Sequence, residues 1–594
     1  MNRSERIRNI AIIAHVDHGK TTIVDRMLQA SHTITSTTTE RAMDSGALER
    51  ERGITILAKN TGITYKDNII NIVDTPGHAD FGGEVERTLQ MVEGFLLLVD
   101  AAEGVLPGTR FVLQKALQLN LKPIVLINKI DRPDADIPAT ESQIHDLFLD
   151  LALHENQLDF PVLYGSGRHG FAGYDQSARS GSIQPLLDAI VKYVPTPKSE
   201  IDTLQILITS LDHSDFLGPI AIGRVFSGAV KTGDQIILCK DKTISAPTKI
   251  IKLFTFHGLT RQETPEVSYG DIVAVAGFDT SPTIGTTLCA VGHPAPHAYV
   301  KIDEPTLSMY FSVNDSPFAG REGTFLTSRN LKDRLQKELR TNVALRVEET
   351  DSPETVKVSG RGQLHLGILI ETMRREGFEL QVSAPEVIYK TIDGEKCEPI
   401  EHVVIDVPAE HQGVVMEMMG NRKAIMQNLS PLPGDRMRIE YHVPSRALLG
   451  FRNQFLTDTR GTGVVTMRFY GYEPYKGDIP TRTKGALVSM DTGTATGYAL
   501  DALQPRGVLF IKPGAPVYDG MIIGEHSRSN DLSVNPCKEK KLTNMRASGT
   551  DDAIKLAPPR IMDLETCIEW IGPDELIEVT PVAIRLRKKP AKRK

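Results

Sequence analysis

The sequence predicts a multidomain α/β and β protein whose first domain is a doubly wound parallel sheet. Up to about residue 197, buried strands alternate with helix-length segments, a pattern typical of a parallel sheet with helices on both faces. From 203 to about 293 the strands are short, alternating and separated by turns, which indicates an antiparallel β-barrel. After residue 300 the order β-α-β-β-α-β occurs twice, which predicts two ferredoxin-like α+β domains.

The first domain should bind its ligand beyond the carboxyl ends of its strands. We expect core strands at 8–14, 69–73, 94–100, 123–128 and 160–164. The first strand runs into a sequence that matches a P-loop, except that it begins with Ala14 where the generic motif has Gly. Backbone N–H groups of such a loop cradle phosphate at a helix N-terminus. The predicted phosphate-binding residues are Asp17, His18, Gly19, Lys20, Thr21 and Thr22.

The P-loop and a second motif both supply contacts to the metal and the outer phosphates. In the P-loop, Lys20 should reach the outer phosphates and the Thr21 hydroxyl should hold Mg²⁺. The motif Asp74-Thr75-Pro76-Gly77-His78 follows the apolar strand at 69–73. We expect Asp74 to bind Mg²⁺ through water and the Gly77 N–H to face the γ-phosphate.

A third motif selects the base. Asn128-Lys129-Ile130-Asp131 follows the buried strand at 123–127. The Asp131 carboxylate can accept hydrogen bonds from both N1–H and the 2-amino group of guanine, whereas adenine offers its amino group elsewhere. The three motifs occur in the order that a nucleotide switch requires. The sequence therefore predicts GTP rather than ATP, with four residues at the base: Asn128, Lys129, Ile130 and Asp131.

With these motifs in place, residues 1 to about 475 resemble a translational GTPase of the elongation factor G group, whose P-loop also begins with Ala. The resemblance implies that 50–56 belongs to the first switch and that Thr55 gives Mg²⁺ its second protein hydroxyl. It also implies a translation-factor β-barrel, followed by counterparts of domains III and V. Only residues 384–401 separate these last two, so the decoding-site domain of elongation factor G is missing and translocation is not expected.

Domain boundaries follow from these patterns. Two prolines within Pro195-Thr196-Pro197-Lys198 forbid helix and mark the end of the first domain. The predicted domains are a P-loop GTPase domain at 1–197, a β-barrel at 198–300, ferredoxin-like domains at 301–387 and 388–477, and a β-rich C-terminal domain at 478–594.

The last of these domains resembles the C-terminal domain of the TypA/BipA subfamily. The polar stretch from Leu542 to Asp551 is a long match, and with it the resemblance covers essentially the whole chain. The LepA subfamily also lacks the decoding-site domain but ends in a different C-terminal domain, so it is the alternative within the same class.

The subfamily resemblance implies a ribosome-dependent GTPase that binds the ribosomal A-site region and hydrolyses GTP to GDP and phosphate. It implies a role in large-subunit assembly and in stress or low-temperature adaptation of translation. The expected partners are GTP and GDP, the 70S ribosome and its subunits, rRNA and the acceptor end of tRNA, with a monomeric chain. The alternative from another functional class is a GTPase that drives a metabolic transfer reaction. Such a protein would require an active-site cysteine or a second nucleotide site beyond residue 300.

The resemblance also implies a catalytic role for His78, which would orient the attacking water once the ribosome engages the factor. The alternative is that His78 only stabilises the switch. Val16 and Ile54 resemble an apolar gate for that histidine, or they are simply core. Asp17 resembles a P-loop aspartate that can bind a monovalent cation, or it is a structural cap.

The hydroxyl-rich run at 31–39 is interpreted as the mobile part of the first switch, or as a merely flexible loop.

The loop after the strand at 160–164 departs from the family pattern. The family usually has Ser-Ala followed by Leu or Lys, and this chain has Gly165-Ser166-Gly167-Arg168. We include Ser166 and Gly167 in the GTP site because a backbone N–H near Gly167 can contact guanine O6. No side-chain role follows from this sequence.

Composition sets further bounds. Apolar content of 40% and charged content of 24% over 594 residues are those of a soluble globular chain. The start lacks the apolar core of a signal peptide, and no apolar run reaches membrane-spanning length, so we expect a cytoplasmic, ribosome-associated protein without a membrane partner. Five cysteines form no C-x-x-C pair, which favours reduced structural thiols.

A formal net charge of −7 argues that RNA binding must come from local basic patches. The candidate patch lies in the C-terminal domain and consists of Lys538, Lys540, Lys541 and Arg546. Such side chains release counterions from phosphates, and the resemblance implies contact near the tRNA acceptor end. The alternative is a solvated loop, and the basic residues from 585 to 594 are equally well explained as a frayed tail.

Overall fold

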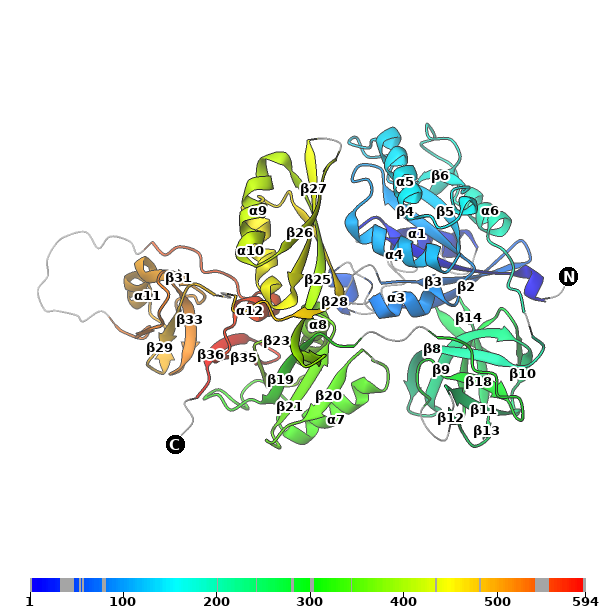
Figure 1. Cartoon of the computed structure of the whole chain (residues 1–594). Coiled ribbons are helices and arrows are strands. Elements are labelled where there is room, and N and C mark those ends of the chain that lie inside the picture. The colour runs from blue at the N-terminus through cyan, green and yellow to red at the C-terminus, as the bar shows by residue number, and fades with distance from the viewer. Residues whose placement is uncertain are drawn as a thin grey trace, which may run out of the picture. The chain divides into compact units, whose positions relative to one another are not determined.

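The structure is a computed structural model in which the chain forms two compact units (Figure 1). One unit contains Met1–Asp303 and Arg340–Val343, and the other contains Glu304–Leu339 and Ala344–Lys594. The residues that the structure describes are 3–15, 17–31, 47–52, 55, 58–76, 82–199, 201–241, 243–278, 282–299, 304–342, 344–432, 435–479, 482–539 and 555–590.

The first unit begins with a seven-stranded sheet in the order β2-β3-β1-β4-β5-β6-β7. Its five inner strands are parallel, and the two edge strands run antiparallel to their neighbours. This confirms the doubly wound sheet with each of its predicted core strands. The strands are β1 (Ile7–Ala14), β2 (Lys59–Tyr65), β3 (Asn68–Asp74), β4 (Gly94–Asp100), β5 (Lys122–Asn128), β6 (Val162–Ser166) and β7 (Phe171–Gly173).

Helices cover both faces of this sheet. Ile10 and Ile12 of β1 belong to a core with α1 (Lys20–Ala30) and α6 (Gln184–Tyr193). Ala11 and Ile13 point to the opposite core, because side chains alternate along a strand. That second core contains α3 (Gly82–Leu89), α4 (Pro107–Gln118) and α5 (Ile137–Leu151). Burial on both sides explains why residues 10–14 of β1 form an unbroken apolar run. The described part of the domain also contains three short helices, which are η1 (Arg3–Arg6), α2 (Ala47–Arg52) and η3 (Glu155–Gln157).

The second domain of this unit is the predicted antiparallel barrel. Its main sheet has nine strands, and a two-stranded sheet joins β10 to β16. The enclosed core is built from Val, Ile and Leu side chains such as Ile206, Val225 and Val273. The strands are β8 (Gln205–Ser214), β9 (Gly218–Ser227), β10 (Ala229–Lys231), β11 (Gln235–Lys240), β12 (Thr243–Ile244), β13 (Thr248–Lys249), β14 (Lys252–His257), β15 (Thr260–Thr264), β16 (Glu266–Ser268), β17 (Ile272–Ala276) and β18 (Thr287–Ala290).

The barrel contacts the first domain at strand β2. The Thr61 hydroxyl donates to the Gly258 carbonyl at 2.7 Å, and the Gly258 N–H donates to the Gly62 carbonyl at 2.7 Å. A Cβ on Gly62 would lie 2.2 Å from the Phe256 carbonyl oxygen, so this approach requires glycine. A buried ion pair between Arg224 and Glu93 also joins the two domains. The barrel therefore holds the β2–β3 hairpin whose last residue is Asp74.

The second unit contains both predicted β-α-β-β-α-β segments. The first is an antiparallel sheet in the order β20-β21-β19-β22, and the second has the equivalent order β26-β27-β25-β28. The first comprises β19 (Leu307–Val313), α7 (Ser328–Leu339), β20 (Arg346–Glu349), β21 (Thr355–Gly360), α8 (Gln363–Arg375) and β22 (Leu380–Ser383). The second comprises β25 (Glu395–Pro408), α9 (Gln412–Asn421), β26 (Ile425–Leu432), β27 (Arg436–Pro444), α10 (Phe451–Asp458) and β28 (Val464–Pro474). Between and within them lie β23 (Glu386–Val387), β24 (Lys390–Ile392), η4 (Ala409–His411) and η5 (Ser445–Leu448).

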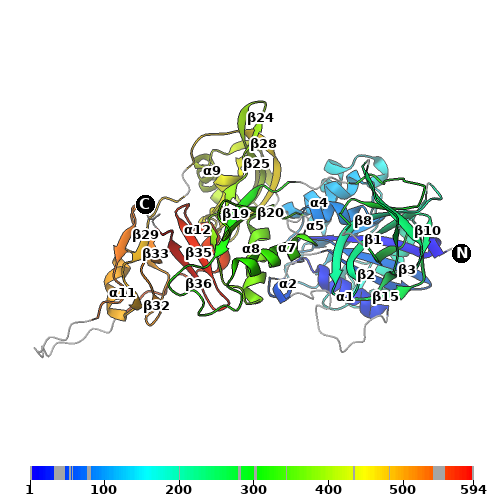
Figure 2. The same ribbon diagram turned by 90° about the horizontal axis from the view of Figure 1, so that it is seen from below.

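The first of these sheets does not end at its fourth strand. Strand β22 pairs antiparallel with β35 (Glu575–Val579), and the sheet continues through β36 (Ile584–Lys588) and β33 (Met521–His526). Helix α12 (Leu564–Trp570) packs beside α8 in the same core. Figure 2 shows the red hairpin β35–β36 continuing the green sheet. The hairpin joins the two predicted domains 301–387 and 478–594, because it satisfies the backbone groups of an otherwise open sheet edge.

The remaining C-terminal elements surround a second, smaller core that includes Leu500, Val517 and Tyr518. They are β29 (Ala486–Ser489), β30 (Gly493–Thr494), α11 (Gly497–Leu503), η6 (Gln504–Arg506), β31 (Gly507–Leu509), β32 (Pro516–Val517) and β34 (Leu532–Val534). The predicted β-rich character of this segment is confirmed.

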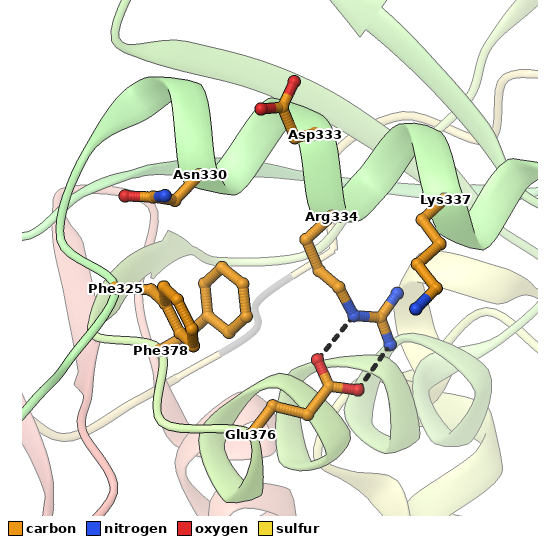
Figure 3. Close-up of a pocket in the computed structure, with 7 residues that line it drawn as sticks. All are labelled: Phe325, Asn330, Asp333, Arg334, Lys337, Glu376 and Phe378. Atoms are coloured by element: carbon orange, nitrogen blue, oxygen red, sulfur yellow. Dashed lines mark hydrogen bonds and ion pairs between the residues drawn. The ribbon is translucent and has the colours of Figure 1, made fainter. Parts of the chain in front are cut away.

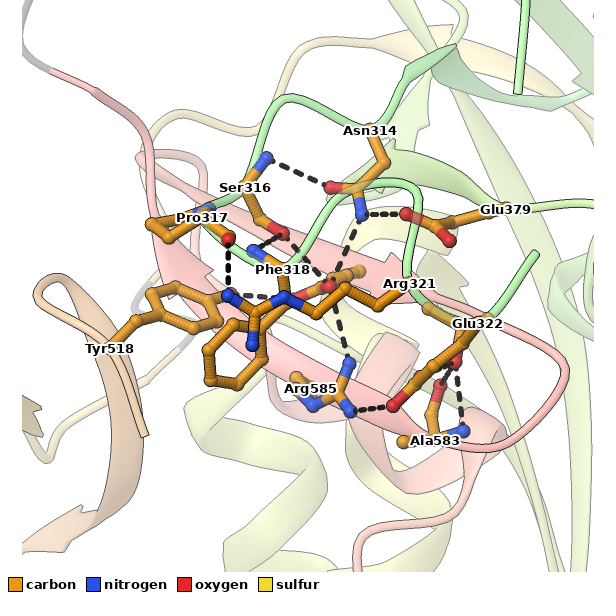
Figure 4. Close-up of polar contacts among 12 residues, drawn as sticks. Asn314, Ser316, Pro317, Phe318, Arg321, Glu322, Glu379, Tyr518, Ala583 and Arg585 are labelled. Atoms are coloured by element: carbon orange, nitrogen blue, oxygen red, sulfur yellow. Dashed lines mark hydrogen bonds and ion pairs between the residues drawn. The ribbon is translucent and has the colours of Figure 1, made fainter. Parts of the chain in front are cut away.

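The buried carboxylate of Glu578 fixes the hairpin to the first ferredoxin-like segment. Figure 4 labels four of its partners, Asn314, Ser316, Tyr518 and Arg585. Glu578 is fully buried and accepts hydrogen bonds from Asn314 Nδ2 at 3.2 Å and Ser316 Oγ at 2.9 Å. It also accepts from the Tyr518 hydroxyl at 2.6 Å and forms an ion pair with Arg585 at 3.2 Å. A buried charge is tolerated when its lone pairs are satisfied in this way. Burial raises the pKa of the Tyr518 hydroxyl, which keeps it a donor.

We expect a chain truncated after residue 477 to lose the fold of 304–387 while the first unit stays folded. The truncation removes apolar side chains from the shared core, among them Leu564, Ile568, Ile577 and Val579, each worth roughly 1.5–3 kcal/mol when fully buried. Their sum is comparable to the about 5–15 kcal/mol that stabilises a whole domain. Hydrogen exchange measures the effect, with a chain ending at 590 as the control. Unchanged protection of β19 to β22 would contradict the shared core.

Candidate functional site

The P-loop lies between β1 and α1, at the carboxyl edge of the parallel sheet. Gly19 precedes α1 with φ of 94°, and Asp17 has φ of 65°. A Cβ on Gly19 would lie 2.5 Å from Asn128 Nδ2. Glycine is therefore required at position 19 by both backbone conformation and space. The N-terminus of α1 that follows is suited to bind a phosphate, as the sequence predicts.

The Asn128 side chain connects three loops of the site. Its Nδ2 donates to the His18 carbonyl at 2.8 Å, and its Oδ1 accepts from the Gly167 N–H at 2.9 Å. Asn128 itself ends strand β5 and is 1% exposed. Asn128 is a predicted GTP-binding residue, and both of its amide atoms hold the P-loop and the Gly167 turn in place.

The predicted metal residues Thr55 and Asp74 lie together with Lys20. Lys20 Nζ is 2.9 Å from Asp74 Oδ1 and also donates to the Thr75 carbonyl. The Thr55 hydroxyl donates to Asp74 Oδ2 at 3.2 Å. Thr21 follows Lys20 as the second residue of α1. Two hydroxyls and a carboxylate are hard oxygen donors, so this set fits Mg²⁺.

The base end of the site has an unsatisfied acceptor. Asp131 Oδ1 is buried and has no hydrogen-bond partner among the described residues, and Oδ2 lies 3.4 Å from His169 Nε2. The neighbouring Lys129 has φ of 59° and pairs with Asp100 at 2.7 Å. The Ile130 N–H donates to the Gly165 carbonyl at 3.3 Å. Because buried polar atoms are normally hydrogen-bonded, Asp131 Oδ1 points to a ligand that donates.

The turn after β6 is held by contacts that the sequence did not reveal. Ser166 is 1% exposed, and its Oγ accepts from the His169 N–H at 3.3 Å. Arg26 of α1 donates to the Gly167 carbonyl at 3.0 Å and to the Arg168 carbonyl at 2.7 Å. No sequence motif marked Arg26 or His169, because their partners lie far away in the chain or belong to another loop.

The side chain of His18 has a structural role. It is fully buried, and its Nδ1 accepts from the Asp100 N–H at 3.4 Å. Its Nε2 lies 3.6 Å from Glu103 Oε2, and the hydrogen bond from His18 is the main cause of the lowered pKa of Glu103. Any contact of His18 with phosphate must therefore come from its backbone.

Several predicted residues lie outside the described residues. They are Val16, Ile54, Gly77, His78, Lys540, Lys541 and Arg546, together with 32–39 of the hydroxyl-rich run. Lys538 is described and exposed, and its carbonyl accepts from the Thr496 hydroxyl at 2.6 Å.

The basic residues near the C-terminus are not all a frayed tail. Arg585, Arg587 and Lys588 belong to strand β36. Each pairs with carboxylates: Arg585 with Glu322 at 2.6 Å and Lys588 with Asp531 at 2.6 Å, for example. The charges of this strand therefore stabilise the fold and are not available as an RNA-binding tail.

The second unit has a shallow hollow of about 330 Å³ between α7 and the end of α8 (Figure 3). Phe325 and Phe378 form its apolar side. Arg334 is paired with Glu376 at 2.5 Å. None of the predicted site residues lines it, so the hollow plays no part in the nucleotide site.

Known protein families account for most of the chain. Residues 5–196 match the elongation factor Tu GTP-binding domain, and 218–289 match elongation factor Tu domain 2. Residues 395–483 match the elongation factor G C-terminus, and 484–593 match the TypA/BipA C-terminal domain. In the described part of the chain, no helix is long and apolar enough to cross a bilayer.

Full-length relatives carry one shared name, large ribosomal subunit assembly factor BipA. The relative from Synechocystis is 52% identical over 98% of both chains. That from Bacillus subtilis is 51% identical over 98% of this chain and 96% of its own, and that from Escherichia coli K12 is 51% identical over 98% and 97%. A crystal structure from Thermus thermophilus has the same fold at a TM-score of 0.56, with 15% identity, and covers 80% of this chain and 98% of its own.

The fold and the site define a GTP-hydrolysing enzyme of the translational GTPase class. Such domains depend on Mg²⁺ in general and bind GTP and GDP. Within that class, the chain belongs to the TypA/BipA family. The C-terminal match decides against the LepA alternative, and the match of the whole chain decides against a metabolic GTPase.

We expect Asn128→Asp to weaken GTP binding by about tenfold to a hundredfold, the scale of an unsatisfied buried polar pair. The new carboxylate still accepts from the Gly167 N–H, but an acceptor now faces the His18 carbonyl where a donor stood. Equilibrium GTP binding measures the change, with the exposed Asn156→Asp as a control of equal charge. Wild-type affinity in Asn128→Asp would show that loop positioning does not depend on this amide.

Proposed function

We propose that this chain is a ribosome-dependent GTPase that hydrolyses GTP to GDP and phosphate and acts in assembly of the large ribosomal subunit. The name shared by its full-length relatives supports the assembly role. The observation that carries the guanine assignment is the buried, unpartnered Asp131 Oδ1 among the described residues. Stress or low-temperature adaptation of translation is the downstream role that we propose with it.

The proposed nucleotide contacts use the geometry of the site. Lys20 exchanges its Asp74 partner for the outer phosphates, and backbone N–H groups from Asp17 to Thr22 hold the rest. Thr21, Thr55 and, through water, Asp74 hold Mg²⁺, which neutralises charge on the phosphates when bound. Their support is the cluster of Lys20, Thr55 and Asp74 with contacts of 2.9 and 3.2 Å.

Two further roles extend the site. Asp17, held at φ of 65° beside the P-loop glycine, is proposed to bind a monovalent cation next to the phosphates. Gly77 is proposed to face the γ-phosphate and His78 to orient the attacking water. The base contacts are proposed for 128–131 and for Ser166 and Gly167.

The proposed partners are the 70S ribosome and its subunits, rRNA and the acceptor end of tRNA. Candidate RNA contacts are Lys538, Lys540, Lys541 and Arg546. We propose a cytoplasmic, ribosome-associated monomer. The support for these assignments is the family of the chain and the exposure of Lys538.

Turnover of GTP with and without purified ribosomes tests the function. We expect stimulation by ribosomes, and we expect His78→Ala to slow the stimulated rate by at least about 10²-fold, the usual scale for losing a water-orienting group. GTP affinity should stay near normal in His78→Ala, whereas Thr21→Ala should weaken Mg²⁺-dependent binding. Absence of any ribosome stimulation would contradict the main proposal, and normal hydrolysis by His78→Ala would contradict only the role of that residue.

Ribosome pelleting over a salt series tests the basic patch. Neutralising Lys538, Lys540, Lys541 and Arg546 should weaken binding and make its salt dependence shallower. Each lost phosphate contact removes roughly one unit from the slope of log K against log salt. Deletion of 591–594 is the control and should have a small effect. An unchanged slope in the neutralised chain would place ribosome recognition elsewhere.

A further inference from the structure

Two consecutive carbonyls of the turn after β6 are held by one arginine of the P-loop helix. Arg26 of α1 donates from Nε to the Gly167 carbonyl at 3.0 Å and from Nη2 to the Arg168 carbonyl at 2.7 Å. Its third nitrogen, Nη1, donates to Gln29 Oε1 at 3.0 Å. Because the guanidinium is a rigid planar fork, these contacts fix both carbonyls relative to α1. The function described so far gives this side chain no role.

The N–H groups of the same turn are used within the site, with one exception. The Gly167 N–H donates to Asn128 Oδ1 at 2.9 Å. The His169 N–H donates to Ser166 Oγ at 3.3 Å. In the part of the chain that the structure describes, the N–H of Arg168 has no hydrogen-bond partner, and this residue is exposed. The turn therefore keeps one backbone donor available for a ligand.

Peptide geometry connects this donor to the arginine. In a trans peptide, the carbonyl and the N–H of the next residue lie in one plane and point in opposite directions. The Gly167 carbonyl and the Arg168 N–H belong to one such unit, which is trans. Arg26 Nε binds this carbonyl from α1, so the Arg168 N–H points away from α1. The arginine thus sets the direction of the available donor.

We propose that Arg26 is a positioning residue for base specificity, which orients the Gly167–Arg168 peptide so that the Arg168 N–H donates to guanine O6. This rests on the proposed guanine site at Asp131. Adenine carries an amino group in place of O6, so the same N–H would meet a second donor there and reject the base.

The position of the turn agrees with this role. Guanine carries O6 on the carbon next to N1, so a donor that reads O6 has to lie beside the carboxylate that reads N1–H. The Ile130 N–H donates to the Gly165 carbonyl at 3.3 Å, which places the base of the turn next to Asp131. A Cβ on Gly167 would lie 3.1 Å from Ile23 Cδ1 of α1, so the turn also packs closely on the helix that carries Arg26.

Binding of three nucleotides to the full-length chain by titration calorimetry tests the proposal: GDP, 6-thio-GDP and inosine diphosphate. In 6-thio-GDP only O6 is replaced, by a sulfur that accepts hydrogen bonds more weakly. We expect the wild-type chain to prefer GDP over 6-thio-GDP by about three- to tenfold, the scale of one hydrogen bond. Arg26→Lys keeps the charge but not the fork, so this preference should fall to within about twofold. Its affinity for 6-thio-GDP should change little, which shows that the site remains folded.

Inosine diphosphate and a matched variant supply the controls. Inosine diphosphate lacks only the 2-amino group that Asp131 is proposed to bind, so Arg26→Lys should keep the wild-type preference for GDP over inosine diphosphate. Loss of both preferences would contradict a specific role at O6. Arg179 donates to the Gln176 and Ala178 carbonyls at 3.1 and 2.9 Å, and none of these is a predicted site residue. Arg179→Lys should therefore bind all three nucleotides as the wild-type chain does.

The outcomes separate this proposal from the function beneath it. If Arg26→Lys keeps the wild-type preference for GDP over 6-thio-GDP, the role of Arg26 is contradicted while the guanine site stands. Equal binding of GDP and 6-thio-GDP by the wild-type chain would contradict the O6 contact itself. Asp131→Asn should lower the preference for GDP over inosine diphosphate. If it does not, the base site is misplaced, and the proposal for Arg26 fails with it.

Discussion

The geometry of the candidate nucleotide site depends on one buried amide, that of Asn128. Its two polar atoms bind the His18 carbonyl and the Gly167 N–H, so the P-loop, the base motif and the turn after β6 hold one relative position. The close approach requires Gly19, whose missing Cβ leaves room for Asn128 Nδ2. A hydrogen bond in a dry site is strong, but an unpaired group there is costly. The two hydrogen bonds of Asn128 therefore order the three loops. Among the described residues, Asp131 Oδ1 is a buried acceptor in this site without a hydrogen-bond donor.

The metal end of the site is organised by a second constraint, the hairpin of β2 and β3. The hairpin follows Thr55 and ends at Asp74, and its strand β2 is pinned to the barrel at Gly62 and Gly258. Two of the predicted Mg²⁺ residues are thus separated by a segment whose position is fixed from outside the first domain. The barrel is therefore physically linked to the predicted metal site. The backbone contacts of this link are close enough that only glycine fits at position 62.

In the second unit the corresponding constraint is the buried carboxylate of Glu578. Its four partners come from the 314–316 loop, from Tyr518 and from Arg585. Since removing one partner of a buried charge is strongly destabilising, this cluster binds the C-terminal hairpin to the first ferredoxin-like sheet. The chain's family-specific C-terminal region is therefore partly built into that sheet and does not form a wholly separate domain.

The sequence by itself determined the elements whose cause is local. Apolar runs and their alternation defined the core strands of the first domain and both β-α-β-β-α-β segments, and the motifs around Lys20, Asp74 and Asp131 predicted the nucleotide site. Strand β2, rich in polar residues, and the pairing of β22 with β35 were decided by tertiary structure. So were the double role of Asn128, the backbone pairing that makes 584–588 a strand, and the contact of His169 with Asp131. Each of these joins residues far apart in the chain or in separate loops, and no local periodicity records which distant group will satisfy a buried polar atom or an open sheet edge.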